Sequence, residues 1–225
     1  MLMSASACSY SDTVRASMIG ISDFKEVKPD LYVSPRIASD QENAIAELIS
    51  NARSRIADKF GAPMSSPKII VSKGEKELRN FKLYKAPGKV LIAPWGNYIL
   101  LNHELANVDV AAHELVHAEI AYRLGYFVRM KKMPTWLDEG IALQVDYRPA
   151  YSNLSEIDDS ELNRVFSLDS PKSFWTEDEE QNVKNYQSSK EAVRTKVLPV
   201  IEEKGLYEFL EEIRTGSSLE GVVGN

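Results

Sequence analysis

The sequence predicts an α+β protein in which a small mixed sheet is followed by an all-helical part. Two observations support this prediction. Short apolar runs typical of strands occur before residue 102, whereas apolar residues at helical spacing occur on both sides of that point. From residue 107 onward we find no convincing strand. Strands and helices should therefore segregate along the chain into two lobes.

Four short runs in the first half of the chain predict the strands. They are residues 30–34, 68–71, 89–93 and 98–101. The last two runs are joined by Pro94-Trp95-Gly96-Asn97, a composition typical of a turn. Between the strands, residues 40–60 have the spacing of an amphipathic helix that ends at Gly61-Ala62-Pro63, and residues 75–81 predict a short helix.

These elements divide the chain into three parts. Residues 1–25 should form a flexible N-terminal segment and residues 217–225 a flexible tail. A single domain should occupy residues 26–216, with an α/β lobe over 26–106 and a helical lobe over 107–216.

Composition narrows the class of protein. The net charge of −6, with no basic stripe to offset it, argues against nucleic-acid binding. No apolar run approaches the ~20 residues that a transmembrane helix needs. An apolar fraction of 44% over 225 residues supports one globular domain with a sizeable core.

Cys8 is the only cysteine, which excludes an intrachain disulfide and a thiolate zinc cluster. The small residues before it resemble the end of a lipoprotein signal, but neither a positive segment nor a full hydrophobic segment precedes them. Two localisations stay open: the cytoplasm, or export as a lipoprotein if the region around Cys8 ends a truncated signal.

The segment His113-Glu114-Leu115-Val116-His117 contains two of the three histidines in the chain. On an α-helix, residues four apart lie on the same face, so both imidazoles can reach one Zn²⁺ at ~2.0–2.1 Å. Glu114 is close enough to act as a general base toward a water at the metal. The third histidine, His103, either touches substrate or has no role.

The residues around this motif predict a mostly apolar helix. Asn107 and Asp109 can each cap its start, and Gly125 can end it. Two histidines and a glutamate on a buried helix are costly without partners, and a metal ion resolves that cost.

A second segment, Pro134-Thr135-Trp136-Leu137-Asp138-Glu139-Gly140, supplies a candidate third ligand. Glu139 follows His117 by 22 positions (139 − 117), which fits a second helix packed antiparallel to the first. A catalytic zinc has three protein ligands and an open fourth position. The alternative is that Trp136 and Leu137 are packing residues and Glu139 is a solvated acid.

These two segments resemble the gluzincin metallopeptidases, the group that includes thermolysin and the aminopeptidase N family. The resemblance implies a zincin-like fold with the active-site cleft between the lobes. It implies that His113, His117 and Glu139 bind zinc and that Glu114 is the general base and acid.

A third segment is similar to the tyrosine-initiated helix of the aminopeptidase-type members. It opens at Tyr186 and continues to Gly205, with a kink at Pro199. The resemblance implies that the Tyr186 hydroxyl stabilises the oxyanion, and Tyr147 and Tyr151 are the alternatives.

Departures from the family bear on specificity. The Gly-x-Met-Glu-Asn strand that binds the free amino group of the substrate in aminopeptidases is missing, and residues 95–104 stand in its place. This favours an endopeptidase. Residues 98–101 are either the edge strand that pairs with extended substrate or an interior strand.

The sequence thus predicts a zinc metallopeptidase that acts on peptide or protein substrates. The alternatives are a non-catalytic zinc-binding protein on the same fold and a zinc hydrolase of a non-peptide bond. The neighbouring acids Asp138 and Glu119 receive no role, because helix geometry turns each away from the adjacent ligand.

Overall fold

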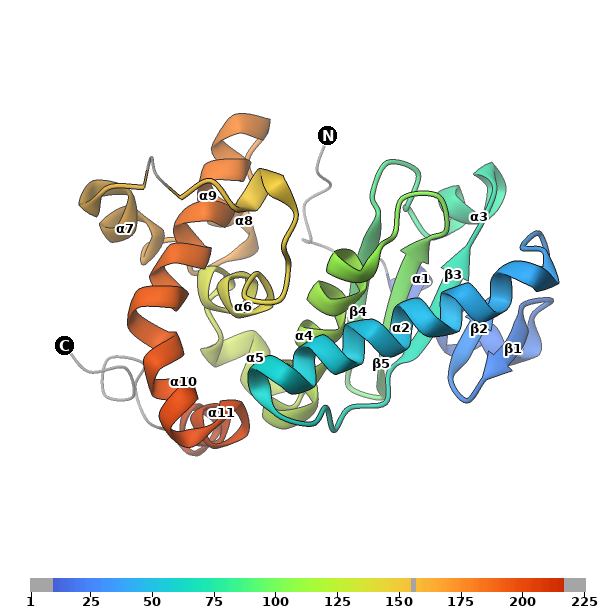
Figure 1. The fold of residues 1–225 in the computed structure, drawn as a ribbon, viewed down its shortest axis with the longest axis horizontal. Helices are drawn as coiled ribbons and strands as arrows, with labels where there is room; N and C mark the ends of the chain where they lie inside the picture. The colour runs from blue at the N-terminus through green and yellow to red at the C-terminus, as the bar shows by residue number, and fades with distance from the viewer. Residues whose placement is uncertain (1–9, 155–156, 217–225) are drawn as a thin grey trace.

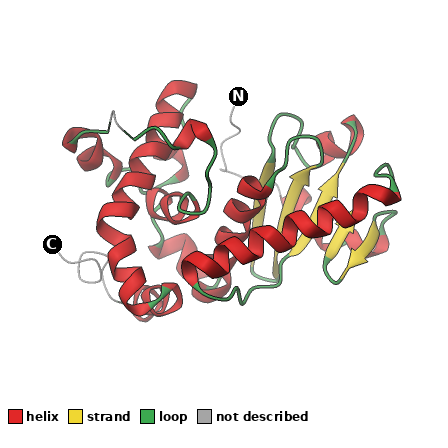
Figure 2. Ribbon diagram, in the orientation of Figure 1, coloured by secondary structure: helices red, strands yellow, loops and turns green. Residues whose placement is uncertain are grey.

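The computed structural model describes residues 10–154 and 157–216. The described chain is α+β, as predicted: the strands gather on one side of the molecule and most helices on the other (Figure 2). The predicted tail, residues 217–225, and the first nine residues, including Cys8, lie outside the described residues. No helix in the described part of the chain is long and apolar enough to cross a bilayer.

In these residues the sheet has five strands in the order β1-β2-β3-β5-β4. The strands are β1 (Lys25–Lys28), β2 (Leu31–Val33), β3 (Lys68–Ser72), β4 (Gly88–Ala93) and β5 (Gly96–Asn102). Strands β2, β3 and β5 are parallel, and the outer strands β1 and β4 are antiparallel to their neighbours. The four predicted strands are confirmed. Strand β1 was missed because it is mostly charged and solvent-exposed.

Strand β5 is interior, which decides between the two alternatives left open for residues 98–101. Its residues Ile99, Leu100 and Leu101 are each at most 1% exposed. A continuous apolar run of this kind belongs to a strand that is covered on both faces. The edge strand on that side of the sheet is β4.

Helices cover both faces of the sheet (Figure 1). Helices α2 (Ser39–Phe60) and α4 (Val108–Leu124) pack against one face and share a core with Ile99 and Leu101. The other face, with Ile70 and Leu100, is covered by α1 (Tyr10–Ser17), η1 (Ile19–Ile21) and α3 (Glu75–Asn80).

The sequence predicts a flexible segment over residues 1–25, and the described part of it, from residue 10, packs onto the sheet. Residues 10–21 are helical, and Ala16 and Ile19 are buried against the sheet. The physical reason is that this face of the sheet is apolar and must be covered.

The remainder of the described chain is helical and contains no strand, as predicted. Its elements are α5 (Tyr126–Lys132), α6 (Thr135–Ala142), η2 (Pro149–Tyr151), α7 (Asp159–Val165), α8 (Pro171–Phe174), α9 (Glu179–Ala192), η3 (Val193–Val197), α10 (Leu198–Lys204) and α11 (Leu206–Thr215). The π-helical turn η3 ends two residues before Pro199, where the sequence predicts a kink.

Candidate metal centre

Helix α4 positions the two histidines at the boundary between the sheet and the helical lobe. It begins where the Asn107 side chain accepts a hydrogen bond from the Val110 N–H at 3.0 Å, and it ends at Gly125, whose φ is 73°. Both assignments confirm the sequence prediction. Asp109, the other candidate cap, instead forms an ion pair with Arg55 of α2.

Helix α6 brings Glu139 to the histidines. Pro134 occupies its N-cap position, and the first-turn N–H groups of Thr135 and Trp136 donate to the carbonyl oxygens of Asp169 and Leu168. Helix α5 makes the return between α4 and α6.

Gly140 follows Glu139 and lets α6 approach α9 closely. A Cβ at Gly140 would lie 2.6 Å from the Ser189 carbonyl oxygen and 2.5 Å from Val193 Cγ2. Only a residue without a side chain fits this contact, so the glycine sets the depth at which α6 packs.

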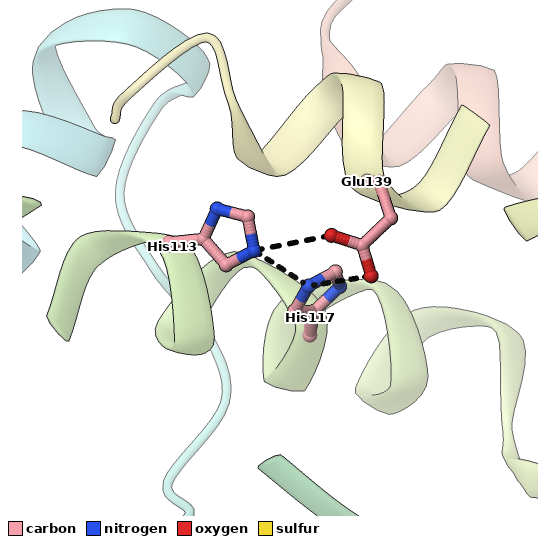
Figure 3. Close-up of side chains that lie close together, drawn as sticks. All are labelled: His113, His117 and Glu139. Atoms are coloured by element: carbon pink, nitrogen blue, oxygen red, sulfur yellow. Dashed lines mark hydrogen bonds and ion pairs between the residues drawn. The ribbon is translucent and has the colours of Figure 1, made fainter. Parts of the chain in front are cut away.

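The two histidines and Glu139 converge on one point (Figure 3). The Nε2 atoms of His113 and His117 are 3.1 Å apart. Glu139 Oε2 lies 3.2 Å from His113 Nε2, and Glu139 Oε1 lies 3.6 Å from His117 Nε2. All three residues are buried, and one ligand atom from each lies within 4.8 Å of the others.

An orphaned oxygen supports a metal ion at this point. In the described part of the chain, the buried Glu139 Oε2 receives no hydrogen bond of good geometry, and its polar neighbour is His113 Nε2 at 3.2 Å. Burying an acceptor without a partner is costly. Two imidazole nitrogens and a carboxylate are a ligand set that zinc takes at catalytic sites, so the residues fit a metal ion.

His113, His117 and Glu139 shift one another's pKa values. Burial acts to lower the pKa of His113, but contacts with Asp146 and Glu139 raise it above its ordinary value. Burial also acts to lower the pKa of His117, but the charges of Asp138 and Glu139 outweigh burial and hold this pKa well above its ordinary value. Burial acts to raise the pKa of Glu139, yet the histidines hold it far below its ordinary value. The cluster therefore favours positive charge beside an ionised Glu139.

Asp138 contacts His117, so the sequence prediction that left it without a role is wrong. Its Oδ1 atom lies 3.0 Å from His117 Nδ1, and its Oδ2 atom accepts from Arg129 of α5. Asp138 and Glu139 do point in different directions on α6, but the imidazole of His117 has two nitrogen atoms. One carboxylate reaches Nδ1 and the other faces Nε2.

Asp146 plays the corresponding part at the other histidine, and sequence reasoning missed it. This fully buried carboxylate lies 3.3 Å from His113 Nδ1 and accepts from Arg148 Nε at 2.9 Å. It follows α6 in a segment without helical spacing, so no periodicity marks it. In the sequence, the one mark of Asp146 is that it lies two residues before Arg148, and this pattern is too common to indicate a site.

Glu114 lies beside the histidine–glutamate group and next to the edge of the sheet. The Glu114 side chain is partly buried. Burial raises the pKa of its carboxyl group above the ordinary value, although the two histidines act to lower it. A Cβ at Gly88 on β4 would lie 3.3 Å from Glu114 Cγ. The predicted base is therefore placed between the ligand cluster and the edge strand.

Tyr186 is in the middle of α9, so the prediction that it opens the helix is wrong in that detail. Its buried hydroxyl accepts a hydrogen bond from Trp175 Nε1 at 2.8 Å, and its ring contacts Tyr151 at 4.9 Å between centroids. Burial first, and then the Glu139 carboxylate, raises the pKa of Tyr186 well above its ordinary value. Tyr147 is 57% exposed and covers Arg55, on the α2 side.

His103, whose role the sequence leaves open, and Glu119, to which it assigns none, lie elsewhere. His103 Nε2 is 3.3 Å from Gln41 Oε1, at the start of α2. The fully buried Glu119 accepts from the Met64 and Ser65 N–H groups and from the Tyr207 hydroxyl, so it anchors a loop and α11. These contacts agree with the prediction that Glu119 has no role in the site.

Comparisons with protein-family models, with curated proteins and with solved structures found no match to this chain. The geometry of the described residues alone thus supports a buried His-His-Glu group able to hold a metal ion.

Proposed function

We propose that this protein is a zinc-dependent metallopeptidase of the gluzincin type, an endopeptidase on a zincin-like fold. One observation carries the proposal. Two Nε2 atoms and a carboxylate from α4 and α6 converge on one buried point, and a further glutamate lies beside them on α4. This is the residue set that metal-assisted hydrolysis requires.

His113, His117 and Glu139 would hold the metal. When bound, a zinc ion supplies Lewis acidity that polarises a carbonyl group and lowers the pKa of water. Of the divalent metals, zinc is the one that a His₂Glu set with an open position suits best.

Glu114 is the residue that would transfer the proton of the attacking water. Its pKa, raised by burial, brings the carboxylate closer to the range in which a general base is efficient at neutral pH. In peptide hydrolysis it would accept a proton from the attacking water and then donate it to the leaving amine nitrogen. Protons therefore balance over the cycle without a second acid.

Tyr186 is the candidate donor to the oxygen that becomes negative when water attacks. Its hydroxyl oxygen already accepts from Trp175, which leaves the phenolic proton free for another acceptor. Its raised pKa keeps that proton in place at neutral pH. The same reasoning applies more weakly to Tyr151, whose pKa is also raised by burial.

Strand β4 is the candidate surface for the substrate main chain. It is the sheet edge nearest Glu114, and an edge strand has unpaired backbone groups that can bind an extended peptide. A peptide added to β4 would run alongside Glu114, as an endopeptidase requires.

The test begins with metal content. We expect about one zinc per purified chain, strongly reduced in His113→Ala and unchanged in His103→Ala, which removes a histidine that contacts Gln41 instead. The zinc-loaded protein should then cleave members of a broad peptide library, with Glu114→Gln as the blank.

Two outcomes would contradict the proposal. No zinc in the unmodified chain after reconstitution would remove the metal site itself. Stoichiometric zinc without peptide cleavage, or with equal cleavage by Glu114→Gln, would leave a non-catalytic zinc protein or a hydrolase of another bond.

A further inference from the structure

The metal centre contains more negative charge than its neighbouring cations neutralise. Three buried carboxylates, Asp138, Glu139 and Asp146, surround the histidines, and Glu114 lies beside them. The arginines in contact with this group are Arg129 and Arg148. Lys190, whose Nζ donates to the Asp146 carbonyl oxygen, is a third cation nearby. With neutral histidines, four carboxylates against three cations leave a net negative charge that a bound cation would offset.

The two arginines occupy equivalent places. Arg129 contacts the Asp138 oxygen that is turned away from His117, and Arg148 contacts both oxygens of Asp146, the partner of His113. A chain from guanidinium to carboxylate to Nδ1 thus leads to each histidine: it ends in a hydrogen bond at His117, and at His113 in a 3.3 Å contact with Asp146 that lacks hydrogen-bond geometry. In both chains Nε2 is left facing Glu139.

This arrangement has a chemical consequence for the histidines. A carboxylate that accepts a proton from Nδ1 fixes the tautomer with a free lone pair on Nε2, which is the form that binds a metal. A buried carboxylate must itself be held ionised and oriented, and a guanidinium can do both. Arg148 donates to Asp146 from Nε and Nη2, whereas Arg129 donates to Asp138 from Nη2 alone.

We propose that Arg129 and Arg148 are positioning residues of the metal centre, which set metal affinity through Asp138–His117 and Asp146–His113. This inference rests on the metal site of the proposed function and deepens it. It also assigns a role to α5: the helix is otherwise a return between α4 and α6, and through Arg129 it becomes part of the centre.

The two chains differ in their surroundings. Arg148 also lies over the Tyr151 ring at 4.9 Å. Arg129 contacts Asp138 from α5.

The experiment measures zinc affinity by competition with a chromophoric chelator and needs no substrate. We expect Arg129→Met and Arg148→Met to weaken binding about 10- to 100-fold, as loss of outer contacts to metal-binding histidines typically does. Arg129→Lys and Arg148→Lys, which keep the charge but lose the planar fork, should recover part of the affinity.

Arg123→Met is the matched control. Arg123 is a partly buried arginine of α4 that pairs with Glu211 of α11 at 3.5 Å; among the described residues it forms no hydrogen bond or ion pair with either aspartate. Its loss should leave zinc affinity within about twofold, and the melting temperatures of the metal-free variants show whether packing has changed.

The spectrum of the cobalt-substituted protein provides a second readout, because it reports the geometry of the ligands. We expect it to change in Arg129→Met and to stay unchanged in Arg123→Met. If the unmodified chain binds no zinc, the proposed function fails together with this inference. If it binds zinc and the methionine variants of Arg129 and Arg148 bind it equally well, only the inference is overturned.

Discussion

Replacing Gly140 by alanine tests whether close packing of α6 on α9 sets the position of Glu139. A Cβ would need to move from 2.6 Å to the 3.4 Å at which ordinary contacts with the Ser189 carbonyl begin, a separation of about 0.8 Å (3.4 − 2.6). A backbone oxygen cannot rotate away as a side chain can, so the helices must part or bend.

The expected magnitude combines two opposing effects. Overpacking costs about 1–3 kcal/mol, and contact with backbone as well as with Val193 places this site near the upper end. Alanine in a helix interior gains up to ~1 kcal/mol over glycine. We therefore expect a net loss of about 2 kcal/mol in the free energy of unfolding, or ~4–8 °C in melting temperature for a chain of this size.

The assay is thermal unfolding of the metal-free protein, followed by zinc titration. Gly20→Ala is the matched control, because the nearest atom to its Cβ would be the Tyr32 hydroxyl at an ordinary 3.6 Å. Zinc affinity of Gly140→Ala should also fall, since metal–ligand distances tolerate only ~0.2 Å. A Gly140→Ala protein as stable as the unmodified one would refute the argument that this contact fixes α6.

Three further predictions concern other parts of the molecule. Gly88→Ala would place a Cβ 2.8 Å from Val110 and 3.3 Å from Glu114. We therefore expect kcat of the zinc-loaded protein to fall about tenfold or more, with zinc affinity retained. An unchanged kcat would argue against a role for β4 in positioning Glu114. Glu119→Ala leaves the buried donors of the 61–67 loop without an acceptor and should cost on the order of 3 kcal/mol in chemical denaturation, with Glu119→Gln costing less. Phe209→Ala removes a fully buried ring from α11 and should cost about 3–5 kcal/mol; a loss below 1 kcal/mol would contradict the packing of α11 onto the core.

The histidine pair and Glu139 could be predicted from the sequence because local geometry determines much of their placement. Residues four apart on one helix share a face in any fold, and the segment between His117 and Glu139 is only long enough for a short return. The contacts of Asp138 and Asp146 depend instead on how α4, α5 and α6 are packed. Spacing along one helix does not contain that information.

The start of α9 illustrates a different limit. Its first turns are polar, so hydrophobic periodicity places the helix start too late, at Tyr186. In the structure Asn182 and Asn185 are buried because their side chains bond to Thr176 and to the Phe174 carbonyl oxygen. Buried amides that are satisfied by hydrogen bonds are not distinguishable from surface amides in a sequence.

The ligands of the proposed metal come from two different helices, α4 and α6. A bound ion would therefore also link these helices and stabilise the tertiary structure. An ion that binds the folded chain and not the unfolded one adds about 2.7 kcal/mol of stability at a free concentration of 100 times its Kd. Zinc supply would then govern how long each molecule persists before unfolding and degradation. Scarcity of the metal would lower the amount of the protein as well as the activity of each copy.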